Sequence, residues 1–460
     1  MKSKFTTLAY THIDDFIYGK APHPVTLKNG LVIGGGEIIP ELNFTLPPMQ
    51  ITQSTLTEVL KQYTEIIEEA CKRADELYLK NLVAEIELLP PTTYEPSWGV
   101  EITKVVKDVM MNYEIKHGIK TGLRITPVDI REDRNSPHMW RGEYFEKIMD
   151  TFRGCALAGA NMLSIESIGG KDVHDDAIMF CDIKKSLFGL GILGVKDMEK
   201  LWTAISNIAA ETDTISAGDT ACGFANTAMV LADRKYIPKV FAAIVRVMAA
   251  VRSLVAYEVG AVGPHKDCGY EGVYVKAITG TPISLEGKSS ACAHLSPVGN
   301  IAAAVADLWS NESIQNIKLL GGMAPTISME QLIYDCRLMN VASSKGHDKA
   351  LMLRDWLVES DSLFDPQAYV LRPDIVFSIS NVIVEQPTYF LKIKAAALAC
   401  IDALRQGLAA KSLLIDDKEI FWLDHFETEL LSISDDEEAF LQEMLVSCAS
   451  EKFEAHKYDL

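Results

Sequence analysis

The stretch Tyr144–Ile168, YFEKIMDTFRGCALAGANMLSIESI, contains the pattern that decides the fold. Apolar residues recur at helical spacing from Tyr144 to Ala158, and a short apolar run, Met162–Ile168, follows directly. The same alternation of a helical pattern and a short apolar run repeats through the middle of the chain. Repeated strand–helix units form a parallel sheet with right-handed crossovers. The pattern therefore predicts an α/β protein.

Working outward, seven short runs are predicted as strands: Leu82–Leu89, Gly122–Val128, Met162–Ile168, Thr214–Ala217, Leu254–Val259, Pro282–Leu285 and Ile317–Leu320. Helical patterns between most of them are Val105–Tyr113, Tyr144–Ala158, Met198–Ala209, Pro238–Val251, Ile301–Leu308 and Met329–Leu338. These seven strand–helix units are one fewer than the eight of a (β/α)₈ barrel. The candidates for the eighth strand are Ala368–Leu371 and Ile375–Ile379. We therefore predict the α/β class, a (β/α)₈ TIM barrel with N-terminal and C-terminal helical extensions. A doubly wound open sheet is the alternative.

The expected domain division has three parts. Residues 1–80 form an N-terminal extension with a long helix from Thr55, where Thr55 and Glu58 match a capping box. Residues 81–380 form the catalytic barrel. Residues 381–460 form a C-terminal helical segment, in which the acidic stretch Glu427–Val446 is predicted to be a solvated amphipathic helix.

Composition excludes several classes of function. The chain has 460 residues and a formal net charge of −19 without any basic block, so we expect no nucleic-acid partner. The apolar region Phe241–Val262 is interrupted by Arg246, Arg252 and Glu258, and the first residues lack the apolar run of a signal peptide. We therefore expect a cytoplasmic protein without a membrane span. Nine cysteines without any CxxC suit free thiols, some of them metal ligands.

Reactive side chains follow three consecutive predicted strands. Glu166 follows the third, Cys222 the fourth, and Cys268 the fifth, within GPHKDCGYEG at 263–272. In a (β/α)₈ barrel the active site forms from the loops at the carboxyl ends of the strands. Neighbouring strands lie about 4.8 Å apart, so the three side chains are expected to converge. Thiolate and carboxylate ligands with one open position suit a catalytic zinc ion.

The residues alone leave alternatives open. Glu166 also suits a buried salt bridge, and Cys222, beside small and apolar residues, also suits a buried structural thiol. Cys292 and His294 follow the sixth predicted strand and could bind metal, and His265 could replace one cysteine ligand. A cysteine nucleophile with His265 or His294 as its base is a further hypothesis.

Four long sequence motifs, three of which contain the three candidate residues, resemble those of a known family. They are NMLSIESIGGKDVHDDAI (161–178), SAGDTACGFANTAM (216–229), GPHKDCGYEG and TPISLEGKSSACAHLSPVGN (281–300). They resemble the zinc-containing methanol:corrinoid methyltransferases of methanol-using anaerobes, and the resemblance covers nearly the whole chain. It implies a (β/α)₈ barrel with a helical extension and one catalytic zinc held by Glu166, Cys222 and Cys268.

The resemblance also implies the reaction and the partner. The methyl group of methanol, activated on zinc, would pass to Co(I) of a corrinoid carried by a separate protein in a stable complex, and we expect a homo-oligomer. Hydroxide is a poor leaving group, so a second group is expected to protonate the departing oxygen, with Asp219, His265 and Asp267 as candidates. The alternatives are another methyl donor, such as a methoxylated compound or a methylamine, and a non-catalytic barrel subunit.

Overall fold

A parallel eight-stranded sheet forms the centre of the molecule. The structure is a computed structural model that describes residues 3–44, 49–131, 136–311, 318–448 and 453–460. The strands follow the order β7-β6-β5-β4-β3-β10-β9-β8, and every ladder between them is parallel. Their bounds are β3 Ile39–Phe44, β4 Asn81–Leu88, β5 Lys120–Pro127, β6 Met162–Ile165, β7 Ile215–Asp219, β8 His265–Asp267, β9 Ile283–Glu286 and β10 Leu308–Ser310.

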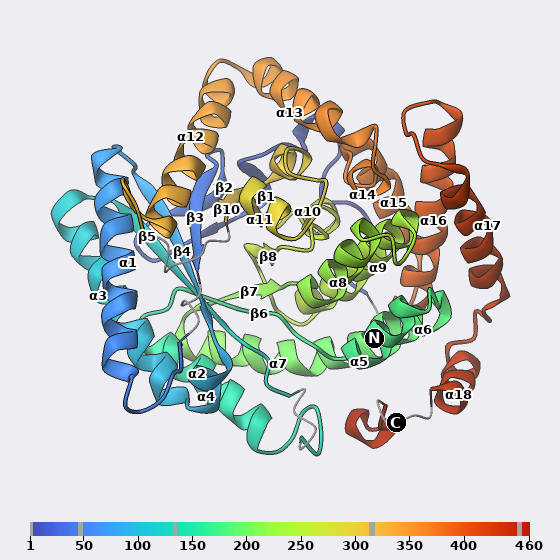
Figure 1. Cartoon of the computed structure of the whole chain (residues 1–460), viewed down its shortest axis with the longest axis horizontal. Coiled ribbons are helices and arrows are strands. Elements are labelled where there is room, and N and C mark those ends of the chain that lie inside the picture. Colours follow the sequence, from blue (N-terminus) through green and yellow to red (C-terminus); the bar gives the residue numbers. More distant parts are fainter. Residues whose placement is uncertain (1–2, 45–48, 132–135, 312–317, 449–452) are drawn as a thin grey trace.

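The two end strands of this order, β7 and β8, lie side by side. The N–H of Val262 donates to the carbonyl of Ser216 at 2.9 Å. A Cβ atom added to Gly218 in β7 would lie 3.2 Å from Cα of His265 in β8. The two ends of the sheet therefore meet, and Figure 1 shows β7 and β8 next to each other. The predicted barrel is confirmed, and the open doubly wound sheet is wrong.

Two of the predicted strands are wrong. Leu254–Val259 belongs to helix α9 (Lys239–Glu258) and the turn after it, and the barrel strand at this place is β8. Of Ile317–Leu320, Ile317 lies outside the described residues, and Lys318–Leu319 form β11, which pairs with β12 (Gly322–Met323) in a separate two-stranded sheet. The barrel strand nearest to this place in the sequence is β10 (Leu308–Ser310). It begins at the last residue of the segment Ile301–Leu308, which was predicted as a helix. The strand prediction for Leu254–Val259 was wrong because helix α9 is buried on all sides. A fully buried helix has the same continuous apolar run as a buried strand.

Both candidates for the eighth strand are also wrong. Ala368–Leu371 overlaps helix α14 (Pro366–Tyr369), and Ile375–Ile379 lies inside helix α15 (Pro373–Glu385). The missing strand is β3, within residues 1–80, and it pairs with β4 and β10. Its sequence, IPELNF, contains Glu41, whose carboxylate binds the buried Arg124 inside the barrel at 2.8 Å. A charged residue at an interior position interrupts the apolar run that predicts a buried strand, so the sequence pattern did not predict β3.

Helices surround the sheet: α1 Leu56–Glu76, α3 Pro96–His117, α4 Glu143–Leu157, α7 Val195–Thr212, α10 Gly272–Thr279, α12 Ala324–Ser344 and α13 His347–Ser362. Thr55 precedes α1 as predicted but makes no side-chain cap. Its hydroxyl instead donates to the carbonyl of Gln50 at 2.7 Å, so the capping box is wrong.

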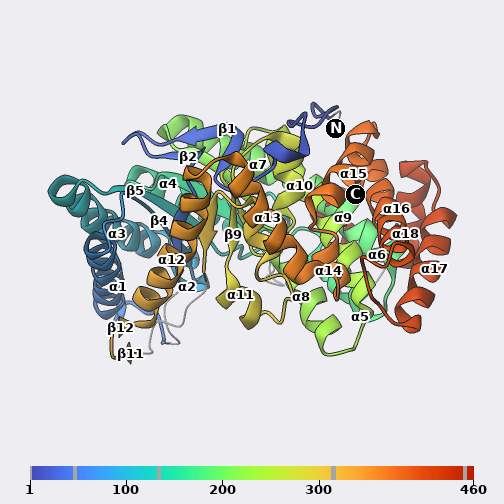
Figure 2. The same ribbon diagram turned by 90° about the horizontal axis from the view of Figure 1, so that it is seen from above.

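A hairpin closes one end of the barrel. Strands β1 (Lys20–Thr26) and β2 (Val32–Gly35) pair antiparallel. Leu31 and Ile33 of this hairpin belong to the same buried cluster as Met162 and Leu308, at the amino ends of barrel strands. Figure 2 shows β1 and β2 at one end of the barrel, with helices α8 (Cys222–Asp233) and α11 (Lys288–Ala293) toward the other. The carboxyl ends of the strands thus lie opposite the hairpin.

The C-terminal part is helical, as expected. Helices α15, α16 (Tyr389–Ala409), α17 (Asp417–Ser432) and α18 (Glu437–Ser447) lie along one side of the barrel (Figure 1). The acidic stretch Glu427–Val446 is two helices rather than one, because Ile433 ends α17 in an extended conformation. Helix α9 is long and apolar enough to cross a membrane by length and composition, but its most apolar window is fully buried within the protein.

Candidate metal centre

The three predicted ligands lie at three successive strand ends of the barrel. Glu166 directly follows β6 and still forms a parallel bridge with Val128. Cys222 is the first residue of α8, after β7, and Cys268 directly follows β8. Their candidate ligand atoms all lie within 4.8 Å of one another, and in the described part of the chain they form the one such group of three or more. The predicted convergence is therefore present, although Cys268 follows β8 rather than the predicted strand Leu254–Val259.

The two cysteine sulfurs are joined as a disulfide, with 5.4 Å between the Cα atoms. The sequence favoured free thiols at both positions, and the other seven cysteines are free. A zinc ion takes deprotonated thiolates, so a disulfide and a zinc site exclude each other. In the reduced state, two thiolates and one carboxylate make a donor set that zinc accepts, with a fourth position left for substrate. The residues therefore fit the expected metal.

The surroundings of Glu166 are acidic. Burial raises the pKa of Glu166 to about 7, while the Lys266 ammonium acts in the opposite direction. Lys266 is 4% exposed and lies 3.0 Å from a carboxylate oxygen of Glu85 and 2.7 Å from one of Glu87. A divalent cation beside Glu166 would stabilise its ionised form, because an opposite charge nearby favours the charged state.

Two buried arginines of α9 hold the loops that carry the three predicted ligands. Arg252 donates to the carbonyl and hydroxyl of Ser167, next to Glu166, and to Asp219 at the end of β7. Arg246 donates to the carbonyl of Gly269, next to Cys268, at 2.6 Å. The sequence singled out both arginines only as interruptions of an apolar run. Charged residues in an otherwise apolar helix are the signal that marks such buried contacts.

Asp219, one of the three candidate proton donors, is fully buried and accepts several hydrogen bonds. Its Oδ2 accepts from the indole of Trp202 at 2.9 Å, and its Oδ1 lies 3.4 Å from the Arg252 guanidinium. Burial raises the pKa of Asp219, while Arg252 and Trp202 act in the opposite direction. The carboxylate therefore joins α7 and α9 to the end of β7.

His265 and Asp267, the other two candidates, belong to a buried network that includes Glu271. His265 Nδ1 lies 3.0 Å from the hydroxyl of Tyr257, and the N–H of Ala221 donates to Glu271 at 2.6 Å. Burial and the Glu271 carboxylate raise the pKa of Asp267 well above its ordinary value. Burial would also raise the pKa of Glu271, but contacts with Asp267 and His265 lower it to about 2. Asp267 therefore holds a proton more tightly than Glu271 does.

Glu271 was missed by the sequence analysis, although it lies three residues after Cys268 in the same motif. The remaining sequence candidates do not join the cluster. Cys292, in α11, is free and exposed, and His294 follows the same helix at a half-buried position.

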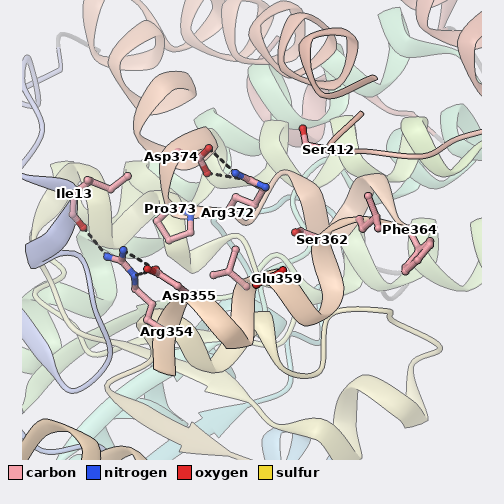
Figure 3. Close-up of a pocket in the computed structure, with 12 residues that line it drawn as sticks. Ile13, Arg354, Asp355, Glu359, Ser362, Phe364, Arg372, Pro373, Asp374 and Ser412 are labelled. Atoms are coloured by element: carbon pink, nitrogen blue, oxygen red, sulfur yellow. Dashed lines mark hydrogen bonds and ion pairs between the residues drawn. The ribbon is translucent and has the colours of Figure 1, made fainter. Parts of the chain in front are cut away.

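A separate pocket of about 550 Å³ lies at α13 and α15 (Figure 3). Its cationic side chains are Arg354 and Arg372, which bind Asp355 and Asp374 respectively at 2.9 Å. None of its lining residues belongs to the loops after β6, β7 or β8. The pocket therefore adds nothing to the candidate centre.

Comparisons with known proteins agree with this geometry. Residues 2–459 match the family model described as methanol-cobalamin methyltransferase B subunit. A curated relative, the methanol–corrinoid protein co-methyltransferase of Methanosarcina barkeri, is 39% identical over 452 residues, or 97% of each chain. The crystal structure of the methanol:cobalamin methyltransferase complex MtaBC from the same organism contains a chain with a TM-score of 0.94 and 38% identity, and 99% of each chain is covered.

Proposed function

Because this chain belongs to the family of methanol-cobalamin methyltransferase B subunits, we propose that it transfers the methyl group of methanol to a corrinoid protein. It is an enzyme of the methyltransferase class. The acceptor would be Co(I) of the corrinoid on the partner protein. The observation that carries the proposal is the convergence of Glu166, Cys222 and Cys268 within 4.8 Å at three strand ends.

The three converging residues would hold one zinc ion. When bound, zinc would supply a Lewis acid that polarises the C–O bond of methanol and stabilises negative charge on its oxygen. The residues of the chain fix where that happens. Glu166 and the two cysteines follow rigid strands, and Arg246 and Arg252 hold the loops between them. This arrangement keeps the ligand atoms close together without help from a flexible loop.

The departing oxygen needs a proton, and Asp219, His265 and Asp267 stay the candidates for the donor. Asp219 uses its oxygens to accept from Trp202 and Arg252. Asp267 lies next to Cys268, and its Oδ1 has no hydrogen-bond donor among the described residues. The Asp219→Asn, His265→Gln and Asp267→Asn variants separate them. The variant that lacks the proton donor should keep zinc but lose methyl transfer from methanol.

Metal analysis of the purified, reduced protein tests the zinc proposal. We expect about one zinc per chain, and a large loss of zinc in the Cys222→Ser, Cys268→Ser and Glu166→Gln variants. The Cys292→Ser variant is the matched control, because this exposed cysteine lies outside the cluster, and it should keep both zinc and activity. Less than about 0.2 zinc per chain in the unmodified protein, without recovery on adding zinc, would contradict the proposal.

The methyl donor and the assembly need their own tests. A panel of methanol, methoxylated compounds and methylamines, assayed with cob(I)alamin, should give turnover with methanol. The M. barkeri structure is described as a complex, MtaBC, and by analogy we propose a stable complex with a corrinoid protein, in a homo-oligomer. Co-purification and light scattering check both. Thiolate ligands stay reduced in the cytoplasm, where we propose that the protein acts.

A further inference from the structure

Asn226 places an amide against both cysteine sulfurs. It lies four residues after Cys222 in α8, and residues at this spacing share one face of a helix. Its Nδ2 donates to Sγ of Cys222 and lies 3.9 Å from Sγ of Cys268. The residue is 9% exposed, so these contacts are sheltered from water.

The orientation of this amide follows from what the sulfurs can do. A thiolate accepts hydrogen bonds and has no proton to donate. A flipped amide would place its oxygen against the sulfurs, acceptor against acceptor. In the observed orientation, Oδ1 of Asn226 has no hydrogen-bond partner among the described residues. The amide thus leaves its oxygen unpaired while its N–H group faces the sulfurs.

Thr220 directs a hydroxyl at the same pair. Its Oγ1 accepts from the N–H of Cys222 at 3.1 Å and from the N–H of Cys268 at 3.5 Å. A hydroxyl has two acceptor lone pairs and one proton, so these two contacts leave only the proton free. Sγ of Cys268 lies 3.8 Å from the same oxygen and receives that proton as a hydrogen bond. Thr220 is fully buried, so water does not compete.

We propose that Thr220 and Asn226 are positioning residues that donate hydrogen bonds to the Cys222 and Cys268 thiolates and thereby strengthen the bound metal as a Lewis acid. This inference rests on the proposed zinc site. Two thiolates and one carboxylate give a divalent ion a net charge near −1, which weakens its pull on a substrate oxygen. Hydrogen bonds to the sulfurs withdraw electron density from them and restore that pull. A disulfide sulfur is a weak acceptor, so the donors suit the reduced state.

The test uses Thr220→Val and Asn226→Leu, which keep side-chain size and remove the donors. In protein loaded with Co(II) in place of zinc, we expect the sulfur-to-cobalt charge-transfer band to move to longer wavelength, because the thiolate electrons are less stabilised. In zinc-loaded protein, we expect iodoacetamide to alkylate the cysteines several-fold faster. Turnover with methanol should fall by about tenfold or more, at about one zinc per chain.

Two further variants make the test specific. Thr227→Val is the matched control, because this neighbouring hydroxyl of α8 donates to the carbonyl of Gly223 at 3.0 Å, and it should change none of the readouts. Asn226→Asp keeps the shape of the side chain and replaces the donor by an acceptor, so it should shift the band at least as far as Asn226→Leu.

The outcomes separate this inference from the proposed function. Unchanged band positions and alkylation rates in metal-loaded Thr220→Val, Asn226→Leu and Asn226→Asp would overturn the inference and leave the zinc site intact. Complete loss of metal from folded Thr220→Val and Asn226→Leu would also overturn it, because the pair would then be needed for binding itself. A wild-type protein that holds neither zinc nor Co(II) would instead overturn the proposed function.

Discussion

The hydroxyl of Tyr458 accepts a hydrogen bond from the backbone N–H of Gly170 at 2.9 Å, so the end of the chain contacts the loop that follows Glu166. Tyr458→Phe keeps the ring, which packs near Trp140, and removes this hydrogen bond. A net loss of about 1 kcal/mol corresponds to roughly fivefold more frequent local opening. We expect faster amide hydrogen exchange in peptides that cover 168–172. Tyr236→Phe, at a side chain 71% exposed, should leave that exchange unchanged.

The disulfide and the proposed zinc site use the same two cysteine sulfurs. We therefore predict that oxidation of these cysteines releases the metal. Reduced protein should titrate nine thiols after denaturation, and protein with the Cys222–Cys268 disulfide should titrate seven. We expect zinc to leave as the two thiols disappear, because a disulfide cannot supply thiolate ligands. A zinc-sensitive dye follows the release, and dithiothreitol with added zinc should reverse it. Oxidised protein that titrates seven thiols and still holds its full zinc would contradict this prediction.

Lys266 joins the buried Glu85 to the half-buried Glu87, and its removal should destabilise the fold. Lys266→Met would leave Glu85, which is 2% exposed, without its cation. Removing one partner of a buried ion pair costs about 3–5 kcal/mol. Urea denaturation should show this loss, and the double variant Lys266→Met/Glu85→Gln should recover part of it. Lys104→Met, at an exposed position of α3, is the control and should change stability little.

His174, fully buried in helix α5 (Lys171–Met179), should make stability fall in acid. Burial, together with the Lys171 and Arg252 cations, lowers its pKa from 6.5 to about 3. The unfolded chain therefore binds a proton below pH 6.5 that the folded chain takes up only near pH 3. At pH 5 this lowers the free energy of unfolding by about 2 kcal/mol.

The His174→Leu variant tests that prediction, because it cannot take up this proton. Its free energy of unfolding should fall less than that of the unmodified protein between pH 7.5 and pH 5. Comparing the two slopes removes any pH-independent cost of the substitution. Equal slopes would show that His174 titrates alike in the folded and unfolded chains.

The sequence predicted that Glu166, Cys222 and Cys268 converge, because the carboxyl ends of parallel barrel strands meet at one face. Glu166 and Cys222 follow apolar strands that any periodicity shows, and Cys268 lies in a polar turn where a structural thiol is unexpected. The strand before Cys268 escaped detection because Lys266, at its centre, points a charge into the barrel toward Glu87. A polar interior removes the apolar signal on which strand prediction depends.

Contacts between distant segments could not be predicted in the same way. Arg252 lies 85 residues from Ser167, and Tyr458 lies 288 residues from Gly170. Such pairs leave no periodic trace in one sequence, and only the fold brings them together. Thr220 and Asn226 lie within a recognised motif, yet their direction toward the sulfurs depends on the turn between β7 and α8.

The two arginines of α9 have a consequence for how the centre responds to change. Arg252 contacts the loops after β6 and β7, and Arg246 contacts the loop after β8. One helix therefore supports all three loops that carry the proposed ligands. A substitution that displaces α9 should therefore disturb all three loops together, whereas a substitution within one loop should act mainly on the one proposed ligand that this loop carries.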